Sequence, residues 1–542
     1  MAAHASRDPG PAAQGPVPPT PAAGEAGTHA LAPALARTDH DSTSAVAQNA
    51  IPPTATTAPG ASAGASIGTG AAIDAARILA DSARLAVEYL AGVPRGPVWQ
   101  PTGEETRAWW AGADLPEDPA ALQDLLAEVR ERVLRYPMGN GHPAFFGWVN
   151  SAPEPTALAG AWLAAAANPS SAGGDHADVL VERTVVRWLA DLVGYPHEDG
   201  AGLLTSGASM ATIVAVGAAR QRALAGLGWD VRRAGLAGGP VLTAYATGET
   251  HSCVGKALEL LGIGSQHLRT VPLRDGRMDP SALADLVAAD RADGVHPFLV
   301  VASAGTVNTG TVDPLDAVAD VCEREQVWFH VDGAYGGFGV LDPQLAAAFR
   351  GLARADSLAL DPHKWLQVPL GVGCLLVADR EQLRASYSLV PPYLREQGGD
   401  RLGWYSEYGI EQSRPFRALP VWATLAGRGR AGVVADICAC TGTARRLGRM
   451  VQDEPGLELA APVELSIVAY RWAPAGVDRA EADRVTAALP TAVSARGRVF
   501  VTGSEFDGRP IVRACLINPL AGDEEARLLV AESIAAGAEL AR

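Results

Sequence analysis

Lys364 is the first residue whose type and position suggest chemistry. Only two of the chain's 44 basic residues are lysines, Lys256 and Lys364, and the others are arginines. Lys364 stands in the sequence Asp-Pro-His-Lys-Trp of residues 361–365, directly after the apolar run Ser357–Leu360. A nucleophilic lysine must lose its proton, and a largely apolar strand end favours the neutral amine. Lys364 is therefore a candidate for chemistry that needs a primary amine, whereas Lys256 is expected to be a solvated lysine on a helix.

Asp332 is a second candidate, because it directly follows the apolar run Val327–Val331. A carboxylate at a buried strand end costs free energy unless a cation or hydrogen-bond donors compensate it. A protonated pyridine nitrogen, a metal ion or the start of a helix would each do so. His and Cys residues do not cluster at ligand spacing, so the sequence predicts no metal site.

A turn of small residues suggests a place for a phosphate group. The segment Leu203–Ser209 combines an apolar stretch with a Ser-Gly-Ala-Ser turn, and a helical pattern begins at Met210. Backbone N–H groups and the dipole at a helix start favour anions, and Ser206 and Ser209 add hydroxyl donors.

Two further apolar runs end in polar segments. His251 lies shortly after the run Val241–Tyr245, and the hydroxyl-rich segment Ser303–Gly310 follows Pro297–Ala302. Ligands of parallel sheets bind beyond the carboxyl ends of the strands. All of these segments are therefore expected to meet in one crevice.

Such a crevice requires a parallel sheet, and the pattern of residues 155–425 predicts one. Short apolar runs alternate there with helical segments such as Ala211–Leu224 and Pro314–Glu325. This alternation is typical of an α/β fold, with a mostly parallel central sheet covered by helices on both faces.

The rest of the chain divides into three parts by composition and periodicity. Residues 1–70 are rich in Ala and Pro and lack aromatic residues, which predicts a disordered tail. Residues 71–154 form an N-terminal helical segment that includes the periodic stretches Ala72–Ala91 and Pro119–Leu134. Residues 426–542 alternate helical and strand-like patterns, which predicts a small C-terminal α+β domain.

The net charge and the cysteine pattern restrict the expected binding partners and the expected cellular compartment. The formal net charge of −16 argues against a nucleic-acid or anionic-membrane partner. We find no signal peptide and no apolar run of eighteen residues, so no membrane partner is expected. The six cysteines form no CxxC pair and are expected to be reduced and buried, which favours a cytoplasmic location.

The order of these segments resembles the group II pyridoxal 5′-phosphate (PLP)-dependent decarboxylase family, which includes aromatic-L-amino-acid, glutamate and histidine decarboxylases. The Asp-Gly-Ala segment Asp332–Ala334, followed later by Pro-His-Lys-Trp, is highly specific for this family. The resemblance begins near Ala72 and reaches the C-terminal domain. It implies the fold-type I PLP-dependent transferase fold and a homodimer, dimerised through segment 71–154, with active sites at the interface.

The resemblance also implies roles for single residues. Lys364 would hold the cofactor as an aldimine, and Asp332 would keep the pyridine nitrogen protonated. His251 would stack on the cofactor ring and take part in catalysis, with Ala334 against the opposite face. In many relatives an Asn precedes the Pro-His-Lys triplet, and this chain departs from that pattern with Asp361. The other cofactor-binding residues implied are Gly207, Ala208, Ser209 and His363 around the phosphate, and Thr306 beside the ring.

The resemblance identifies Tyr393 as the acid that completes the reaction. Relatives carry a tyrosine in a Pro-x-Tyr-Leu context on a mobile loop, and this chain has Pro391–Leu394. After CO₂ leaves, this phenol would protonate Cα and release the amine. Relatives with Phe at this position tend to be oxidative aldehyde synthases, so Tyr393 favours simple decarboxylation. The alternatives are such an oxidative deaminase, another PLP lyase, or a PLP-binding homologue without turnover, which the intact Lys364 and Asp332 disfavour.

Two segments bear on the small-molecule substrate, an L-amino acid. Trp148, within His142–Asn150, falls where relatives specific for aromatic substrates carry an aromatic residue. In contrast, the segment Asn168–His176 has small and polar residues, including Ser171, in place of the bulky aromatics of those relatives. Trp148 and Ser171 are therefore predicted substrate contacts, and the substrate is either aromatic or a branched-chain or other aliphatic amino acid.

Overall fold

The structure is a computed structural model that describes residues 67–198, 200–389 and 404–542. It begins with helices, as the periodicity of the N-terminal segment predicts. Helix α1 begins at Ile67, inside the segment 1–70 that was expected to be disordered, and residues 1–66 lie outside the described part. The helices of this region are α1 (Ile67–Gly92), α2 (Glu104–Ala111) and α3 (Leu122–Glu128), which continues as a π-helical turn over Val129–Leu134.

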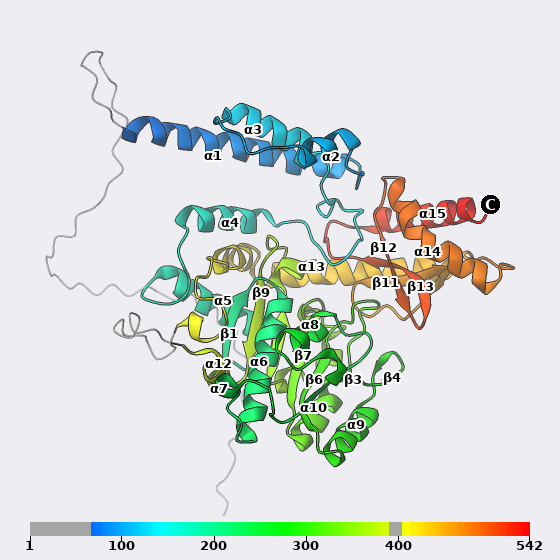
Figure 1. Ribbon diagram of the computed structural model, residues 1–542. Helices are drawn as coiled ribbons and strands as arrows, with labels where there is room; N and C mark the ends of the chain where they lie inside the picture. Colours follow the sequence, from blue (N-terminus) through cyan, green and yellow to red (C-terminus); the bar gives the residue numbers. More distant parts are fainter. Residues whose placement is uncertain (1–66, 199, 390–403) are drawn as a thin grey trace, which may run out of the picture. The chain divides into compact units, whose positions relative to one another are not determined.

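The central sheet has seven strands in the order β1-β9-β8-β7-β6-β2-β3. Strands β3, β2, β6, β7 and β8 run parallel, whereas β9 pairs antiparallel with both β8 and β1. The mostly parallel sheet of the α/β prediction is therefore confirmed (Figure 1). The strands are β1 (Ala201–Thr205), β2 (Leu242–Ala246), β3 (Leu268–Thr270), β6 (His296–Ser303), β7 (Trp328–Asp332), β8 (Ser357–Leu360) and β9 (Gly373–Val377), beside a short hairpin of β4 (Leu273–Arg274) and β5 (Arg277–Met278).

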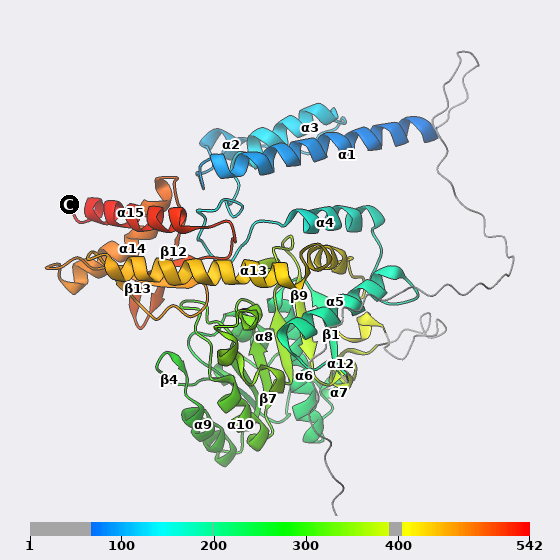
Figure 2. The ribbon, with the colours of Figure 1, turned by 180° about the vertical axis from the view of Figure 1, so that it is seen from behind.

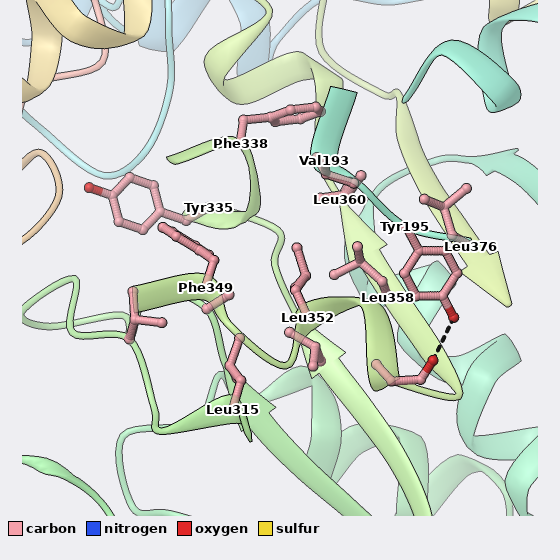
Figure 3. Close-up of a cluster of buried hydrophobic side chains, with 14 of the residues drawn as sticks. Val193, Tyr195, Leu315, Tyr335, Phe338, Phe349, Leu352, Leu358, Leu360 and Leu376 are labelled. Carbon is pink, nitrogen blue, oxygen red and sulfur yellow. Dashed lines mark hydrogen bonds between the residues drawn. The ribbon is translucent and has the colours of Figure 1, made fainter. Parts of the chain in front are cut away.

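Helices cover both faces of this sheet, because alternate strand residues face opposite sides. On β6, Val300 and Ala302 pack in one apolar cluster, and Leu299 and Val301 pack in the other. Figure 3 shows part of the first cluster, where the Tyr195 hydroxyl donates a hydrogen bond of 2.7 Å to the backbone carbonyl of Ala355. The first cluster includes residues of α5 (Ala177–Val193), α9 (Pro280–Ala292) and α10 (Leu315–Glu325), and the second includes residues of α6 (Ala208–Gly226), α8 (Cys253–Leu260) and α12 (Arg380–Tyr387).

The register of the parallel strands brings their carboxyl ends level. Ser303 at the end of β6 pairs with Asp332 at the end of β7, and Asp332 pairs with Ala359 on β8. Directly after β8, the short helix α11 (Pro362–Trp365) carries Lys364. The polar residues that follow the strands are thus held along one edge of the sheet.

A buried ion pair fixes the end of strand β1. The guanidinium of Arg414 donates to Glu182 at 2.6 Å and to the backbone carbonyl of Leu204 at 2.7 Å. Glu182 in turn accepts the backbone N–H of Leu204 at 2.9 Å. Both polar groups of Leu204 are therefore bound just before the turn that begins at Ser206. The side chains of Arg414 and Glu182 are both buried, so their pairing offsets the free-energy cost of removing them from water.

The C-terminal residues form a second, antiparallel sheet in the order β10-β11-β13-β12, beside helices, as the predicted α+β domain requires. Figure 2 labels its strands β12 and β13 near helices α14 and α15. The long helix α13 (Ala418–Asp453) packs against α4 (Pro155–Ala167) and α5 and also against elements of this second sheet. The predicted boundary at 425/426 falls inside α13, shortly before a kink at Gly429. The remaining elements are β10 (Leu457–Leu459), β11 (Ile467–Trp472), α14 (Arg479–Ala495), β12 (Thr502–Phe506), β13 (Arg509–Cys515) and α15 (Asp523–Leu540).

No described helix is both long and apolar enough to span a bilayer. Within residues 67–198, 200–389 and 404–542, no group of His, Cys, Asp and Glu side chains could hold a metal ion.

Candidate functional site

A cavity of about 670 Å³ lies at the carboxyl ends of the central strands. It brings together segments that are far apart in the sequence, which the positions of the strand ends predict. Nine of the predicted site residues line it: Trp148, Gly207, Ala208, Ser209, His251, Asp332, Ala334, His363 and Lys364.

The turn Ser206–Ser209 at the start of α6 lines the cavity. Gly207 has a φ of +154°, which a residue with a side chain rarely adopts, and α6 begins at the next residue. A Cβ at Gly373 would lie 2.5 Å from Cα of Gly207, so glycine at 373 lets β9 approach this turn. The positive end of the helix dipole and the hydroxyls of Ser206 and Ser209 suit a phosphate group.

Asp332 is buried at the end of β7, with 9% of its surface exposed. Its Oδ1 accepts the backbone N–H of Ala334 at 3.1 Å. No described residue donates to Oδ2, and the carboxylate lines the cavity. Because a buried carboxylate needs compensation, the free oxygen fits the protonated ring nitrogen of a bound pyridine.

His330 supports the same strand from within the core. It is fully buried, its Nδ1 lies 2.8 Å from the Ser357 hydroxyl, and its Nε2 has no partner among the described residues. Burial lowers the pKa of His330 to about 4, although the nearby charge of Asp332 acts to raise it. The folded chain therefore holds this imidazole neutral.

Acid should destabilise the fold through His330. An unfolded histidine titrates near 6.5, so between about pH 6.5 and 4 the unfolded state binds a proton that the folded state does not. This difference removes about 3 kcal/mol of stability as the pH falls through that range. His330→Gln should lose this component when the free energy of unfolding is measured against pH. The exposed His197 provides the control, and an identical pH slope for His330→Gln and His197→Gln would contradict the assignment.

Lys364 lines the cavity beside the carboxylate of Asp361. Its Nζ lies 3.0 Å from Oδ2 of Asp361, whose Oδ1 accepts the backbone N–H of Ala208 at 2.7 Å. Asp361 thus connects the lysine with the start of α6. Lys256, as expected, is exposed on α8.

The hydrogen bonds of two histidines define which of their ring nitrogen atoms donates and which accepts. Nδ1 of His251 accepts the backbone N–H of Cys253 at 3.2 Å, which leaves Nε2 as the donor of the neutral ring. Nδ1 of His363 lies 2.7 Å from the carbonyl of Val372, so Nδ1 donates there. Burial lowers the pKa of His363, and its Nε2 can donate to a phosphate oxygen only after gaining a proton.

Three predicted residues are not brought to the cavity by the described chain. The hydroxyl of Thr306 bonds within its own loop, to Thr309 at 2.9 Å and to the backbone N–H of Thr311 at 3.1 Å. Ser171 is fully buried, and its hydroxyl donates to Asp178 at 2.6 Å. Tyr393 lies outside the described residues. Its role, and those of Thr306 and Ser171, stay predictions.

The small domain contributes residues that the sequence analysis missed. Thr502, Gly503, Ser504 and Arg513 line the cavity. The guanidinium of Arg513 is held by the backbone carbonyls of Val307 at 2.7 Å and Trp148 at 3.0 Å. A signal was present, because Arg513 interrupts an apolar strand, where a charge is costly unless it is used.

Trp148 forms part of the cavity wall. It has a φ of +46° and its side chain is 47% exposed. Its ring lies 6.1 Å from that of Phe145 and 5.3 Å from that of Phe500, measured between centroids. This aromatic group belongs to the N-terminal segment and the small domain together.

The residues of the cavity fit PLP. The Ser206–Ser209 turn suits its phosphate, Lys364 offers an amine, and the free oxygen of Asp332 suits its ring nitrogen. His251 and Ala334 line the same cavity.

Comparison with known proteins also supports PLP as the cofactor. Residues 107–473 match the family model described as the pyridoxal-dependent decarboxylase conserved domain. Aromatic-L-amino-acid decarboxylase of Bacillus atrophaeus is 31% identical over 417 residues, covering 76% of this chain and 84% of that protein. Phenylacetaldehyde synthase of Arabidopsis thaliana is 26% identical over 424 residues, covering 76% and 85%. The crystal structure of Oryza sativa TDC with PLP and tryptamine superposes with a TM-score of 0.82 at 26% identity, covering 89% of this chain and all of that one.

Proposed function

Because the chain belongs to the pyridoxal-dependent decarboxylase family, and is therefore a PLP enzyme that decarboxylates an amino acid, we propose that Lys364 binds the cofactor and that the strand-end cavity is the active site. The observation that carries this proposal is the convergence of Lys364, Asp332 and the Ser206–Ser209 turn on one cavity. When bound, PLP supplies an electron sink for the electron pair that remains on Cα after CO₂ leaves.

The chain's own residues prepare this chemistry. Asp332 would accept a hydrogen bond from the protonated ring nitrogen through Oδ2 and so hold the positive charge there. His251 would cover one face of the ring and Ala334 the other, which fixes the ring and excludes water. The start of α6 would orient the phosphate, with Ser206 and Ser209 donating hydrogen bonds.

Arg513 is the group we assign to the carboxylate of the amino acid. Its guanidinium lines the cavity, and the carbonyls of Val307 and Trp148 orient it. An oriented guanidinium binds carboxylates well. Near Arg513, Trp148 provides an aromatic wall for the side chain of an aromatic or branched-chain aliphatic substrate.

The test is a product screen. Purified enzyme with PLP is incubated with each of the twenty amino acids, and CO₂ and amine are followed together. Equal amounts of CO₂ and amine from an aromatic or branched-chain amino acid are expected. Formation of neither product from any amino acid would contradict the proposal.

We assign the proton transfer to Cα to Tyr393, from its Pro-x-Tyr-Leu context. Tyr393→Phe should still release CO₂, because that step does not use the phenol. It should lose amine formation in favour of a reaction with dioxygen and water that gives aldehyde, ammonia and hydrogen peroxide. Product analysis with an oxygen electrode measures both. Tyr387→Phe is the matched control, because the Tyr387 hydroxyl bonds only to the carbonyl of Val214 at 2.8 Å.

Two outcomes would change this assignment. Amine formation at the wild-type rate by Tyr393→Phe would require another acid, and His251 would be the next candidate. Consumption of dioxygen by the wild-type enzyme in step with CO₂ would favour the oxidative activity that the Arabidopsis relative's name describes.

We also propose that the enzyme is a cytoplasmic homodimer. Large apolar side chains are exposed along the N-terminal helices and their neighbours, as a surface that pairs with a second copy requires. Free thiols, five of them buried, fit a reducing compartment. Light scattering of the purified chain tests the dimer, and cell fractionation tests the location. The exposed apolar residues include Leu79, Val87, Trp110, Val133, Trp162 and Leu163.

A further inference from the structure

Asp361 places a negative charge where the phosphate of PLP is expected. It is buried, with 4% of its surface exposed, and its Oδ1 lies 2.7 Å from the backbone nitrogen of Ala208. Ala208 is the first residue of α6, and its N–H is one of the donors that a phosphate at this helix start would use. The carboxylate therefore occupies a donor of the phosphate site.

The same carboxylate also holds the cofactor-binding lysine. Its Oδ2 lies 3.0 Å from Nζ of Lys364, while Nδ1 of His363 lies 3.7 Å from Oδ1 and donates to the carbonyl of Val372. When Lys364 binds the cofactor, its amine can no longer compensate the negative charge of Asp361, as the free amine does in this structure. Asp361 would then keep only the N–H of Ala208 as a close partner among the described residues.

Few positive charges oppose this effect. Among the described residues that line the cavity, the lysine and arginine side chains are Lys364 and Arg513. The guanidinium of Arg513 is already bound to the carbonyls of Val307 and Trp148. A phosphate dianion beside Asp361 thus meets a like charge in a partly buried site, where such repulsion is strong.

We propose that Asp361 is an internal anion that competes with the phosphate of PLP, and that its negative charge lowers the affinity of this enzyme for its cofactor. The inference rests on the proposed place of the phosphate at the Ser206–Ser209 turn. Without cofactor, Asp361 accepts the backbone N–H of Ala208 at the start of α6 and pairs with Nζ of Lys364, so the site stays ordered. The Asn that many relatives carry here would accept the same N–H without the charge.

The test uses the full-length enzyme freed of cofactor and three probes. PLP has both the phosphate and the aldehyde, pyridoxamine 5′-phosphate has the phosphate but cannot condense with Lys364, and pyridoxal has only the aldehyde. Dissociation constants are measured by fluorescence for wild type, Asp361→Asn and the control Asp285→Asn, which removes one charge from an exposed position on α9. Asp361→Ser repeats the measurement if the Asn variant is not recovered folded.

We expect Asp361→Asn to bind PLP and pyridoxamine 5′-phosphate at least tenfold more tightly than wild type, with pyridoxal changed less than threefold and the Asp285 variant unchanged. Unchanged or weaker binding of the two phosphates would overturn the inference. An equal gain for all three probes would also overturn it, because Asp361 would then act through Lys364 alone. If wild type itself fails to bind PLP, the proposed function fails instead.

Discussion

Lys364→Ala should abolish decarboxylation and the visible absorbance of bound PLP while the protein stays folded. Among the described residues that line the cavity, Lys364 alone carries an amine, so the variant has no substitute there for nucleophilic attachment of the cofactor. The fold should survive, because Asp361, which pairs with Lys364, keeps the backbone N–H of Ala208 as a partner. Activity should fall by several orders of magnitude, measured as CO₂ release.

The second lysine provides a matched control. Lys256 is exposed on α8, so Lys256→Ala should keep wild-type activity and absorbance. Reduction of the wild-type enzyme with borohydride, followed by peptide mapping, should find the pyridoxyl group on Lys364. A label on Lys256, or turnover by Lys364→Ala, would refute the assignment.

Asp332→Asn should bind PLP and yet turn over about a thousandfold more slowly. The amide keeps the shape, and its oxygen can still accept the N–H of Ala334. It no longer carries the charge that stabilises the protonated ring nitrogen, a loss of about 4 kcal/mol in the transition state. The effect should therefore appear in kcat, with PLP still bound by absorbance.

Another buried aspartate shows whether the effect is local. Asp313 accepts backbone N–H groups from Met278 and Ser303 at 2.8 and 2.7 Å and does not line the cavity. Asp313→Asn should lower stability without a thousandfold loss in kcat. A near-normal rate for Asp332→Asn would mean that Asp332 only caps the turn after β7.

The sequence predicts the parts of this site that depend on local pattern. Short apolar runs mark the buried parallel strands, and Ser357–Leu360 is observed with the predicted bounds. The residues after such runs reach the same edge because parallel strands share one direction. This rule brings Asp332, Lys364 and His251 together without knowledge of any distance.

Features that depend on long-range packing could not be predicted from the local sequence pattern. An apolar run carries no direction, so the antiparallel orientation of β9 is not visible in the sequence. Arg513 enters the cavity only because the small domain packs beside the strand ends. The hydroxyl of Thr306 turns away because two neighbours in its own loop bind it. Each of these outcomes depends on partners that no local pattern specifies.

Helix α13 has a consequence for the cooperativity of the whole chain. It packs against α4 and α5 and also against α15, β10 and β11. Melting of either sheet would expose part of α13, so we expect the stabilities of the two cores to be coupled. The same coupling would stabilise the cavity wall formed by Thr502–Ser504 and Arg513.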